Sequence, residues 1–392
     1  MRATTAWGRF DDLRAGVASR FTDLAAELVA MTPQEVPQLL AEVDSATRAG
    51  WWAFGFVSYE AAAGLDPALA VHEPVAGLPA AWFGLVARPE RVPVIRPSGR
   101  QGCFVGDWEY AWSEREHREA VEAVRAHIAA GEAYQCNLTT RMTAPVRGFL
   151  PGLYADLAHA QAGAHNAYLD LGRFTVVSAS PELFFERRGE RLVMRPMKGT
   201  APRGRSVAED RDLVARLRAS AKERAENVMI VDLVRNDLAR LAVTGSVAVT
   251  RLCRAERYPT VHQLTSEVTA RVRPDVDLTA LFRALFPCGS VTGAPKHRAM
   301  EILRALEPEP RGVYCGAIGV VGPEGARFGV AIRTALVDRD TGTARYGTGG
   351  GITWGSTPRA EYAELQAKAA VLTALPTTGA DRRPVPTKEA RP

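Results

Sequence analysis

The stretch from Ser178 to Gly204 constrains the fold most, because its sequence is typical of a β-hairpin whose two ends carry reactive side chains. Two β-rich runs, a turn and a return strand follow one another, at residues 174–178, 183–187, 188–190 and 191–195. A hairpin brings its ends together, so we expect Glu182 and Lys198 to lie close in space. The carboxyl and the amine could form an acid–nucleophile pair, or they could form a surface salt bridge.

The lysine at position 198 is informative because the chain takes almost all of its positive charge from arginine. Among 49 Lys and Arg residues, the lysines are Lys198, Lys222, Lys296, Lys368 and Lys388. Arginine keeps its proton in proteins, whereas a lysine with a lowered pKa becomes a nucleophile. The composition therefore shifts the balance toward a chemical role for Lys198.

Overall composition argues against several classes of protein. A chain of 392 residues that is 46% hydrophobic can bury the core of one large domain or two. The net charge of +5 is spread along the chain, which argues against nucleic-acid binding. The cysteines are well separated and include no C-x-x-C pair, which indicates reduced thiols. Because no apolar leader and no run of about 18 apolar residues occurs, we expect a cytoplasmic protein that does not associate with a membrane.

The chain divides by composition into three parts. Residues 1–102 are expected to form an α/β portion that packs on the core, and the Pro-, Arg- and Gly-rich segment 88–102 predicts a linker or long surface connection. The elements expected before it are two helices and a buried strand, at 23–29, 34–48 and 51–59. Residues 103–376 are expected to form the larger domain, and the Pro-, Arg- and Thr-rich residues 377–392 are expected to be disordered.

Two expected helices carry glutamates three residues apart, one at 221–241 and one that begins after an N-cap at Thr357. The charged residues that share a face are Glu223 with Glu226, and Glu361 with Glu364 and Lys368. These faces could be ordinary solvated surface. If the helices face each other across a cavity, their carboxylates could instead bind one Mg²⁺ together with water and substrate oxygens. Further helices are expected at 113–130, 207–217 and 298–306, and a further strand at 313–321.

Polar groups occur in or beside three expected strands and loops. Gln135, in a strand at 134–141, points either into a polar cavity or toward solvent at a strand edge. Arg333 lies in the middle of an apolar strand at 328–337, where its charge must be paired or must bind an anion such as a carboxylate. The run Gly347–Gly351 predicts a flexible loop whose backbone amides can approach an anion.

Two further features have plain structural interpretations. His262 stands alone beside apolar residues, which favours a hydrogen-bonded structural histidine over a ligand. The glycine-rich segment 286–297 does not match a phosphate-binding P-loop, because Pro295 precedes Lys296 and a histidine replaces the required Ser or Thr. We interpret it as a turn that caps a helix and can bind an anion at the helix N-terminus.

Residues 110–372 resemble the chorismate-utilising enzymes, a family of anthranilate, isochorismate, salicylate and aminodeoxychorismate synthases. The matching motifs are SASPELF, RPMKGTAPRG, KERAENVMIVDLVRNDLARL, LFPCGSVTGAPK, YCGAIG, the strand around Arg333, GTGGGIT and AEYAELQAK. The resemblance implies an α+β fold with two large packed antiparallel β-sheets flanked by helices. It also implies that residues 103–376 are a catalytic domain that binds chorismate through Mg²⁺.

A few positions distinguish the activities within this family. Anthranilate, isochorismate and salicylate synthases have alanine where this chain has Lys198, and the lysine is similar to component I of the aminodeoxychorismate synthases. Isochorismate and salicylate synthases activate water with a lysine at the position of Gln135, so its absence argues against water as the nucleophile. The chain also lacks a clear Leu-Leu-Glu-Ser motif for tryptophan binding. The alternatives are formation of anthranilate or 2-amino-2-deoxyisochorismate, and a non-catalytic relative that binds a ligand.

The resemblance assigns a role to each candidate residue. Glu182 would protonate the departing C4 hydroxyl while Lys198 adds at C2. Ammonia would then attack C4 and expel the lysine from C2 to give 4-amino-4-deoxychorismate, the precursor of p-aminobenzoate. A separate glutamine amidotransferase subunit would supply the ammonia, because no cysteine lies in a recognisable nucleophile motif. Substrate binding is assigned to Gln135, Thr200, His262, Thr292, Tyr314, Arg333, Gly349, Gly350 and Lys368. Metal binding is assigned to Glu226, Glu364, Glu223 and Glu361.

Overall fold

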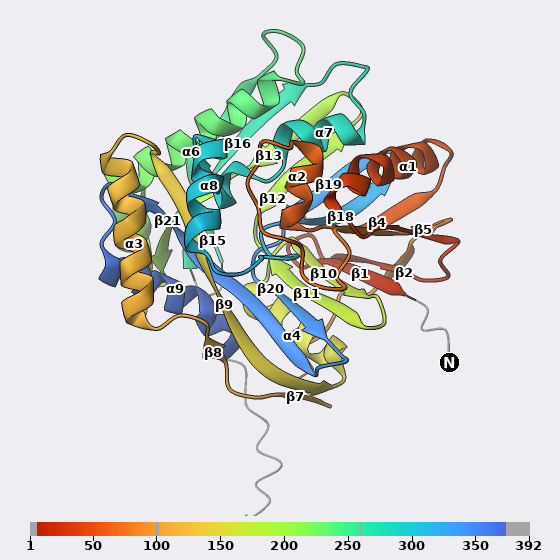
Figure 1. Cartoon of the computed structure of the whole chain (residues 1–392), viewed down its shortest axis with the longest axis horizontal. Coiled ribbons are helices and arrows are strands. Elements are labelled where there is room, and N and C mark those ends of the chain that lie inside the picture. The colour runs from red at the N-terminus through yellow and green to blue at the C-terminus, as the bar shows by residue number, and fades with distance from the viewer. Residues whose placement is uncertain (1–5, 99–101, 259–260, 374–392) are drawn as a thin grey trace, which may run out of the picture.

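The computed structural model describes residues 6–98, 102–258 and 261–373, and two large antiparallel β-sheets form its framework (Figure 1). Helices surround the sheets, which confirms the α+β arrangement implied by the resemblance. None of the helices in the described ranges combines the length and apolarity needed to cross a membrane.

The first sheet has the strand order β17-β9-β21-β20-β11-β10-β1-β2-β6, and β7 and β8 pair with β9. Its strands are β1 Trp7–Asp12, β2 Val17–Phe21, β6 Glu90–Val92, β7 Cys103–Val105, β8 Glu109–Tyr110, β9 Gln135–Gly148, β10 His165–Asp170, β11 Phe174–Ser180, β17 Gly293–Ala294, β20 Thr334–Asp338 and β21 Thr343–Thr353.

The second sheet has the order β14-β16-β13-β12-β19-β18-β4-β5-β3, and β15 pairs with β16. Its strands are β3 Ala26–Ala30, β4 Trp52–Val57, β5 Ala81–Val86, β12 Leu183–Arg188, β13 Arg191–Arg195, β14 Met197–Pro202, β15 Ala248–Arg257, β16 Val261–Arg271, β18 Ala317–Gly322 and β19 Gly325–Val330. Strands from residues 6–98 thus belong to both sheets, and β6 lies within the segment expected to be a linker.

The two sheets pack face to face through large apolar side chains. Phe21 of the first sheet stacks on Phe54 of the second, with 4.8 Å between ring centroids. Leu169, Val176 and Ile318 belong to the same buried cluster. Burial of each such side chain contributes about 1.5–3 kcal/mol, so this layer fixes how the sheets sit on each other.

Helices cover the outer faces of both sheets. The helices are α1 Val36–Arg48, α2 Ala62–Leu65, α3 Glu114–Ala129, α4 Leu150–Gln161, α5 Val207–Ala219, α6 Ala221–Ala239, α7 Leu278–Leu285, α8 Lys296–Leu306 and α9 Pro358–Thr373. Leu157 of α4 and Ala369 of α9 pack on the first sheet, whereas Leu40 of α1, Ile230 of α6 and Leu281 of α7 belong to the cluster on the second. These contacts place α6 and α9 beside different sheets.

The predicted hairpin is confirmed. β12 and β13 pair antiparallel from Leu183 opposite Arg195 to Arg188 opposite Arg191. The strand predicted at 51–59 and the helix predicted at 34–48 are also present, as β4 and α1.

Residues 23–29 form no helix, contrary to the prediction. Asp23 has a φ of 56°, in the left-handed region that interrupts a right-handed helix. The following residues form β3, which hydrogen-bonds to β5 from Ala26 opposite Leu85 to Ala30 opposite Ala81. Pairing with an available sheet edge therefore outweighs the helix propensity of this Ala- and Leu-rich segment.

Two predictions near the C-terminal half are also wrong. The strand expected at 328–337 is interrupted, because β19 ends at Val330 in one sheet and β20 begins at Thr334 in the other. Arg333 lies at this crossover with a φ of 52°. The run Gly347–Gly351 is part of β21 and pairs with β9, because the sheet partner orders a glycine segment that would be flexible alone. The tail at 377–392 lies outside the described residues.

Candidate active site

Strands from both sheets converge where the hairpin meets β9 and β21. A Cβ atom added at Gly351 would lie 2.7 Å from Gln135 Nε2 and 3.0 Å from Lys198 Nζ. Glycine at this position therefore leaves the space that both side chains occupy. Gln135 is buried, and neither its side-chain oxygen nor its nitrogen has a hydrogen-bond partner among the described residues. The amide is thus buried beside the Lys198 amine, and the alternative of a solvent-facing edge is wrong.

Glu182 lies at the crossover from β11 to β12 and is 3% exposed, so it does not form a surface salt bridge. Its backbone is fixed by a 3.2 Å hydrogen bond from its N–H to Ser180 Oγ and by a 3.0 Å bond from Val330 N–H to its carbonyl oxygen. Burial raises the pKa of Glu182 to about 7, although Ser290 and the charge of Lys198 oppose the shift. A carboxyl group with such a pKa can donate a proton near neutral pH.

Lys198 lies on β14, and its environment disfavours the protonated amine. Burial and the positive charge of Lys368 lower its pKa, while Glu182, Glu226 and Glu364 act in the opposite direction. Burial thus favours the neutral forms of both Glu182 and Lys198, which is the combination needed by an acid and a nucleophile.

Glutamates from α6 and α9 gather beside these two residues. Burial raises the pKa values of Glu223, Glu226 and Glu361, and charges on neighbouring glutamates add to each shift. Burial also acts to raise the pKa of Glu364, but the adjacent Lys368 ammonium, with 2.7 Å between Nζ and Oε1, leaves it below its usual value. The sequence placed these carboxylates together correctly.

This acidic group fits a divalent cation. A Cβ atom at Gly350 would lie 3.2 Å from Glu361 Oε2 and 3.9 Å from Glu364 Oε1, so glycine keeps the space in front of them open. Carboxylate oxygens are hard ligands of the kind that Mg²⁺ prefers, and a bound cation would offset the repulsion among these carboxylates. Across residues 6–98, 102–258 and 261–373, no three acidic, His or Cys side chains are already arranged around one metal position. A cation here would therefore depend on few carboxylates plus water or substrate oxygens.

Other predicted residues differ in how closely they join this group. Lys368 Nζ donates a 2.7 Å hydrogen bond to the Gly349 carbonyl, and its own carbonyl accepts one of 3.1 Å from Arg333 Nη1. Tyr314 lies against Gly347, where a Cβ atom would be 2.1 Å from its ring. Thr292 is buried and its hydroxyl donates to the Cys288 carbonyl at 3.2 Å.

Two candidates contact other parts of the protein. His262 Nε2 lies 2.9 Å from Asp210 Oδ1 on α5, which agrees with a structural role. Thr200 is exposed on β14, opposite Gln263. The segment at 286–297 caps α8, and Lys296 pairs with Asp237 at 3.1 Å.

Sequence reasoning missed Asn227, which joins the lysine strand to the glutamate helix. Its Nδ2 donates to the Lys198 carbonyl at 3.2 Å, and its Oδ1 accepts a hydrogen bond of 2.5 Å from Ser266 Oγ. The residue follows Glu226 directly, so a buried amide beside a predicted ligand was the available signal.

Replacing Asn227 with alanine is expected to lower the free energy of unfolding by about 1–3 kcal/mol, because the buried Ser266 hydroxyl and Lys198 carbonyl lose their partner. Chemical denaturation would measure this change. The matched change at Asn236, which is exposed on the same helix, should have little effect. Equal stability of both variants would contradict the bridging role.

Comparison with known proteins identifies the family of the chain. Residues 96–374 match the family model described as chorismate binding enzyme. The chain belongs to the chorismate-binding enzyme family. Anthranilate synthase component 1 of Streptomyces coelicolor is 42% identical over 300 residues, which cover 76% of this chain and 57% of that protein. Aminodeoxychorismate synthase of Streptomyces griseus is 42% identical over 290 residues, which cover 73% and 40%.

Aminodeoxychorismate synthase component 1 of Salmonella typhimurium is 40% identical over 283 residues, with 72% of this chain and 60% of that protein covered. The match thus spans about half the length of these curated relatives. Solved structures share the fold. Anthranilate synthase component I from Streptococcus pneumoniae has a TM-score of 0.75 at 24% identity, with 95% and 93% of the chains covered. The menaquinone-specific isochorismate synthase from Escherichia coli has a TM-score of 0.72 at 17% identity, with 95% and 89% covered.

Proposed function

We propose that the chain converts chorismate and ammonia to 4-amino-4-deoxychorismate, as an aminodeoxychorismate synthase component I. The observation that carries the proposal is an amine, Lys198, with a lowered pKa beside the buried Glu182. Relatives with the names anthranilate synthase and aminodeoxychorismate synthase are similarly close, so identity does not separate the two activities. Lys198 favours the second, because the resemblance gives anthranilate synthases an alanine at this position.

The two reactive residues would divide the chemistry. Protonated Glu182 would donate its proton to the C4 hydroxyl so that water leaves, while neutral Lys198 bonds to C2 and the ring double bonds shift. Ammonia would then attack C4, the double bonds would shift back and the C2–N bond to Lys198 would break. The protons lost by the adding amines restore Glu182 and Lys198, so the net reaction exchanges a hydroxyl for an amine and releases water.

The glutamates of α6 and α9 would hold Mg²⁺, with Glu226 and Glu364 as ligands and Glu223 and Glu361 beside them. When bound, the ion would grip a substrate carboxylate and offset its charge. Arg333 and Lys368 would add positive charge near the same end of the substrate.

Glu226→Gln and Glu364→Gln are each expected to weaken Mg²⁺ binding at least tenfold, because each removes one ligand charge while nearly keeping its shape. Calorimetric titration with Mg²⁺ in the absence of substrate measures the binding, and turnover at limiting Mg²⁺ should fall in parallel. Glu122→Gln, an exposed change on α3, is the control. Unchanged titrations for both site variants would remove the metal assignment.

The chain alone is expected to use ammonia but not glutamine. All five cysteines are buried, and burial raises the pKa values of Cys136, Cys288 and Cys315 to about 12, which suppresses the thiolate that a glutaminase needs. The proposal therefore includes a separate amidotransferase subunit as partner. Product formation from chorismate is expected with ammonium chloride at alkaline pH and not with glutamine. Glutamine-dependent turnover by the purified chain would contradict this prediction.

Product identity provides the decisive test. The chain would be incubated with chorismate, Mg²⁺ and ammonium chloride, and the product separated by chromatography and identified by mass and absorbance. We expect 4-amino-4-deoxychorismate. Several relatives are named anthranilate synthase, and formation of anthranilate by this chain would show that Lys198 does not set the position of amination. No turnover together with saturable chorismate binding would indicate a non-catalytic relative.

A further inference from the structure

A cavity of about 520 Å³ lies beside the hairpin, on the side formed by β13, β15 and β16. Pro181, Leu183 and Met197, which are chain neighbours of Glu182 and Lys198, line it, but its other walls are strongly polar. None of the residues assigned above to chorismate or metal binding lines it. We refer to it as the arginine pocket.

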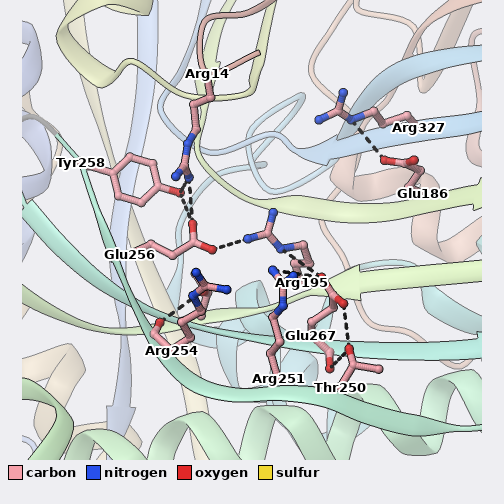
Figure 2. A network of polar contacts seen from close by, with 11 residues as sticks. Arg14, Glu186, Arg195, Thr250, Arg251, Arg254, Glu256, Tyr258, Glu267 and Arg327 are labelled. Carbon is pink, nitrogen blue, oxygen red and sulfur yellow. Dashed lines mark hydrogen bonds and ion pairs between the residues drawn. The ribbon is translucent and has the colours of Figure 1, made fainter.

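Positive charge exceeds negative charge in the arginine pocket. The lining arginines are Arg14, Arg195, Arg251, Arg254, Arg257 and Arg327, whereas Asp12 and Glu256 are its carboxylates. Glu186 and Glu267 lie close by, and Figure 2 shows Arg327 beside Glu186 and Arg195 beside Glu256 and Glu267. Asp210 lies 4.0 Å from Arg257, so the six arginines face five carboxylates and arginine remains in excess.

Some of these arginines form ion pairs with nearby carboxylates. Glu256 forms ion pairs with Arg14, at 2.8 Å from its Oε2, and with Arg195 through its Oε1 (Figure 2). Arg327 contacts Asp12 at 3.3 Å and Glu186 at 3.6 Å. The two ion pairs hold Glu256 in place as one wall of the pocket, whereas Arg251 and Arg254 are exposed at its opening.

The excess charge comes from β15. Arg251 is 4.0 Å from Glu267, its only ion-pair partner within the described ranges, and the Arg254 guanidinium has no hydrogen bond or ion pair to any described residue. Between them Cys253 has a φ of 49°, and the pairing with β16 shifts register on both sides of Arg251. Such bulges re-aim side chains. Here the bulge is pinned by a 2.9 Å hydrogen bond from Cys253 N–H to Ser266 Oγ.

The positive charge of these arginines acts on a half-buried histidine, His165. Burial, followed by the charges of Arg327, Arg195 and Arg14, holds the pKa of His165 well below its usual range. His165 thus lines the pocket as a neutral imidazole, which can exchange hydrogen bonds with a ligand without adding charge.

We propose that the arginine pocket binds a small organic anion that carries two or more carboxylate or phosphate groups. Arg251 and Arg254 would grip one anionic group through the paired N–H donors of their guanidinium groups, and His165 would contact the body of the ligand. An anion would offset the uncompensated charge, whereas an apolar or cationic ligand would leave or increase it.

Calorimetric titration of the metal-free protein with inorganic pyrophosphate and with citrate tests the proposal. The double variant Arg251→Gln/Arg254→Gln is compared with Arg216→Gln/Arg218→Gln, which removes the same charge from exposed positions on the neighbouring α5. We expect saturable binding of one or both probes by the parent and the α5 variant, and at least tenfold weaker binding by the pocket variant. The tighter probe distinguishes a phosphate from a carboxylate ligand.

No saturable binding of either probe, or equal weakening in both double variants, would overturn the proposal, because the second result indicates a general charge effect. Thermal unfolding of all proteins verifies that the variants are folded. The titration contains no chorismate, so its result is independent of the proposed enzymatic function.

Discussion

Lys198→Arg is expected to reduce turnover with chorismate and ammonia by about a thousandfold or more. Arginine keeps the charge and approximate reach of the lysine but does not lose its proton, so it does not act as a nucleophile. A residue that only attracted chorismate would tolerate the change and mainly alter KM. The variant therefore separates covalent chemistry from electrostatic binding at the same position.

The matched control is Lys222→Arg, the same substitution at a half-exposed lysine on α6. It should retain most of the turnover, because its charge is kept and no bond to substrate is proposed for it. Lys198→Ala should leave space beside Gln135 and Gly351 that water or ammonia can enter, so traces of products substituted at C2 are expected.

Intact-protein mass measured after reaction with chorismate in the absence of ammonia tests the covalent step directly. An adduct that maps to the Lys198 peptide is expected in the parent and absent from Lys198→Arg. An active Lys198→Arg enzyme, with no adduct on the parent, would contradict covalent catalysis and would indicate direct attack by ammonia.

The sequence predicted the site better where local pattern and tertiary packing agree. The hairpin follows from alternating β-rich runs around a turn, and it correctly brought Glu182 toward Lys198. Residues spaced at i, i+3 and i+7 likewise placed Glu361, Glu364 and Lys368 on one face of α9, a property of helix geometry alone.

The sequence failed where a distant partner decides the structure. Gly347–Gly351 has no strand propensity, and only pairing with β9, more than 200 residues earlier at Asn137–Arg141, makes it a strand. The prediction placed Arg333 within a continuous strand, because its apolar neighbours give no indication of the crossover between the sheets. The hydrogen bonds of Asn227 and the bulge at Cys253 could not be predicted for the same reason, since both depend on contacts with Ser266.

Glu182→Gln is expected to reduce turnover by about a hundredfold to ten-thousandfold, the usual range for loss of a general acid. Glutamine keeps the size and polarity of the side chain but holds no acidic proton for the departing C4 hydroxyl. Glu190→Gln, at the exposed turn of the same hairpin, is the control and should retain turnover.

Glu182→Gln should lower turnover but raise the free energy of unfolding at alkaline pH, which distinguishes a catalytic acid from a structural residue. Burial raises the folded-state pKa of Glu182 to about 7, above its ordinary value of 4.5. Below pH 4.5 the carboxyl is protonated in both the folded and the unfolded chain. As the pH rises from 4.5 toward 7, the free energy of unfolding falls, because the carboxyl ionises more readily in the unfolded chain than in its buried position. Glutamine does not ionise, so at pH 8 Glu182→Gln should have a higher free energy of unfolding than the parent, and the difference should shrink toward pH 4.5. Denaturation series across this pH range measure it, and a variant that is less stable at pH 8 and still fully active would show that Glu182 holds the fold together rather than donating the proton.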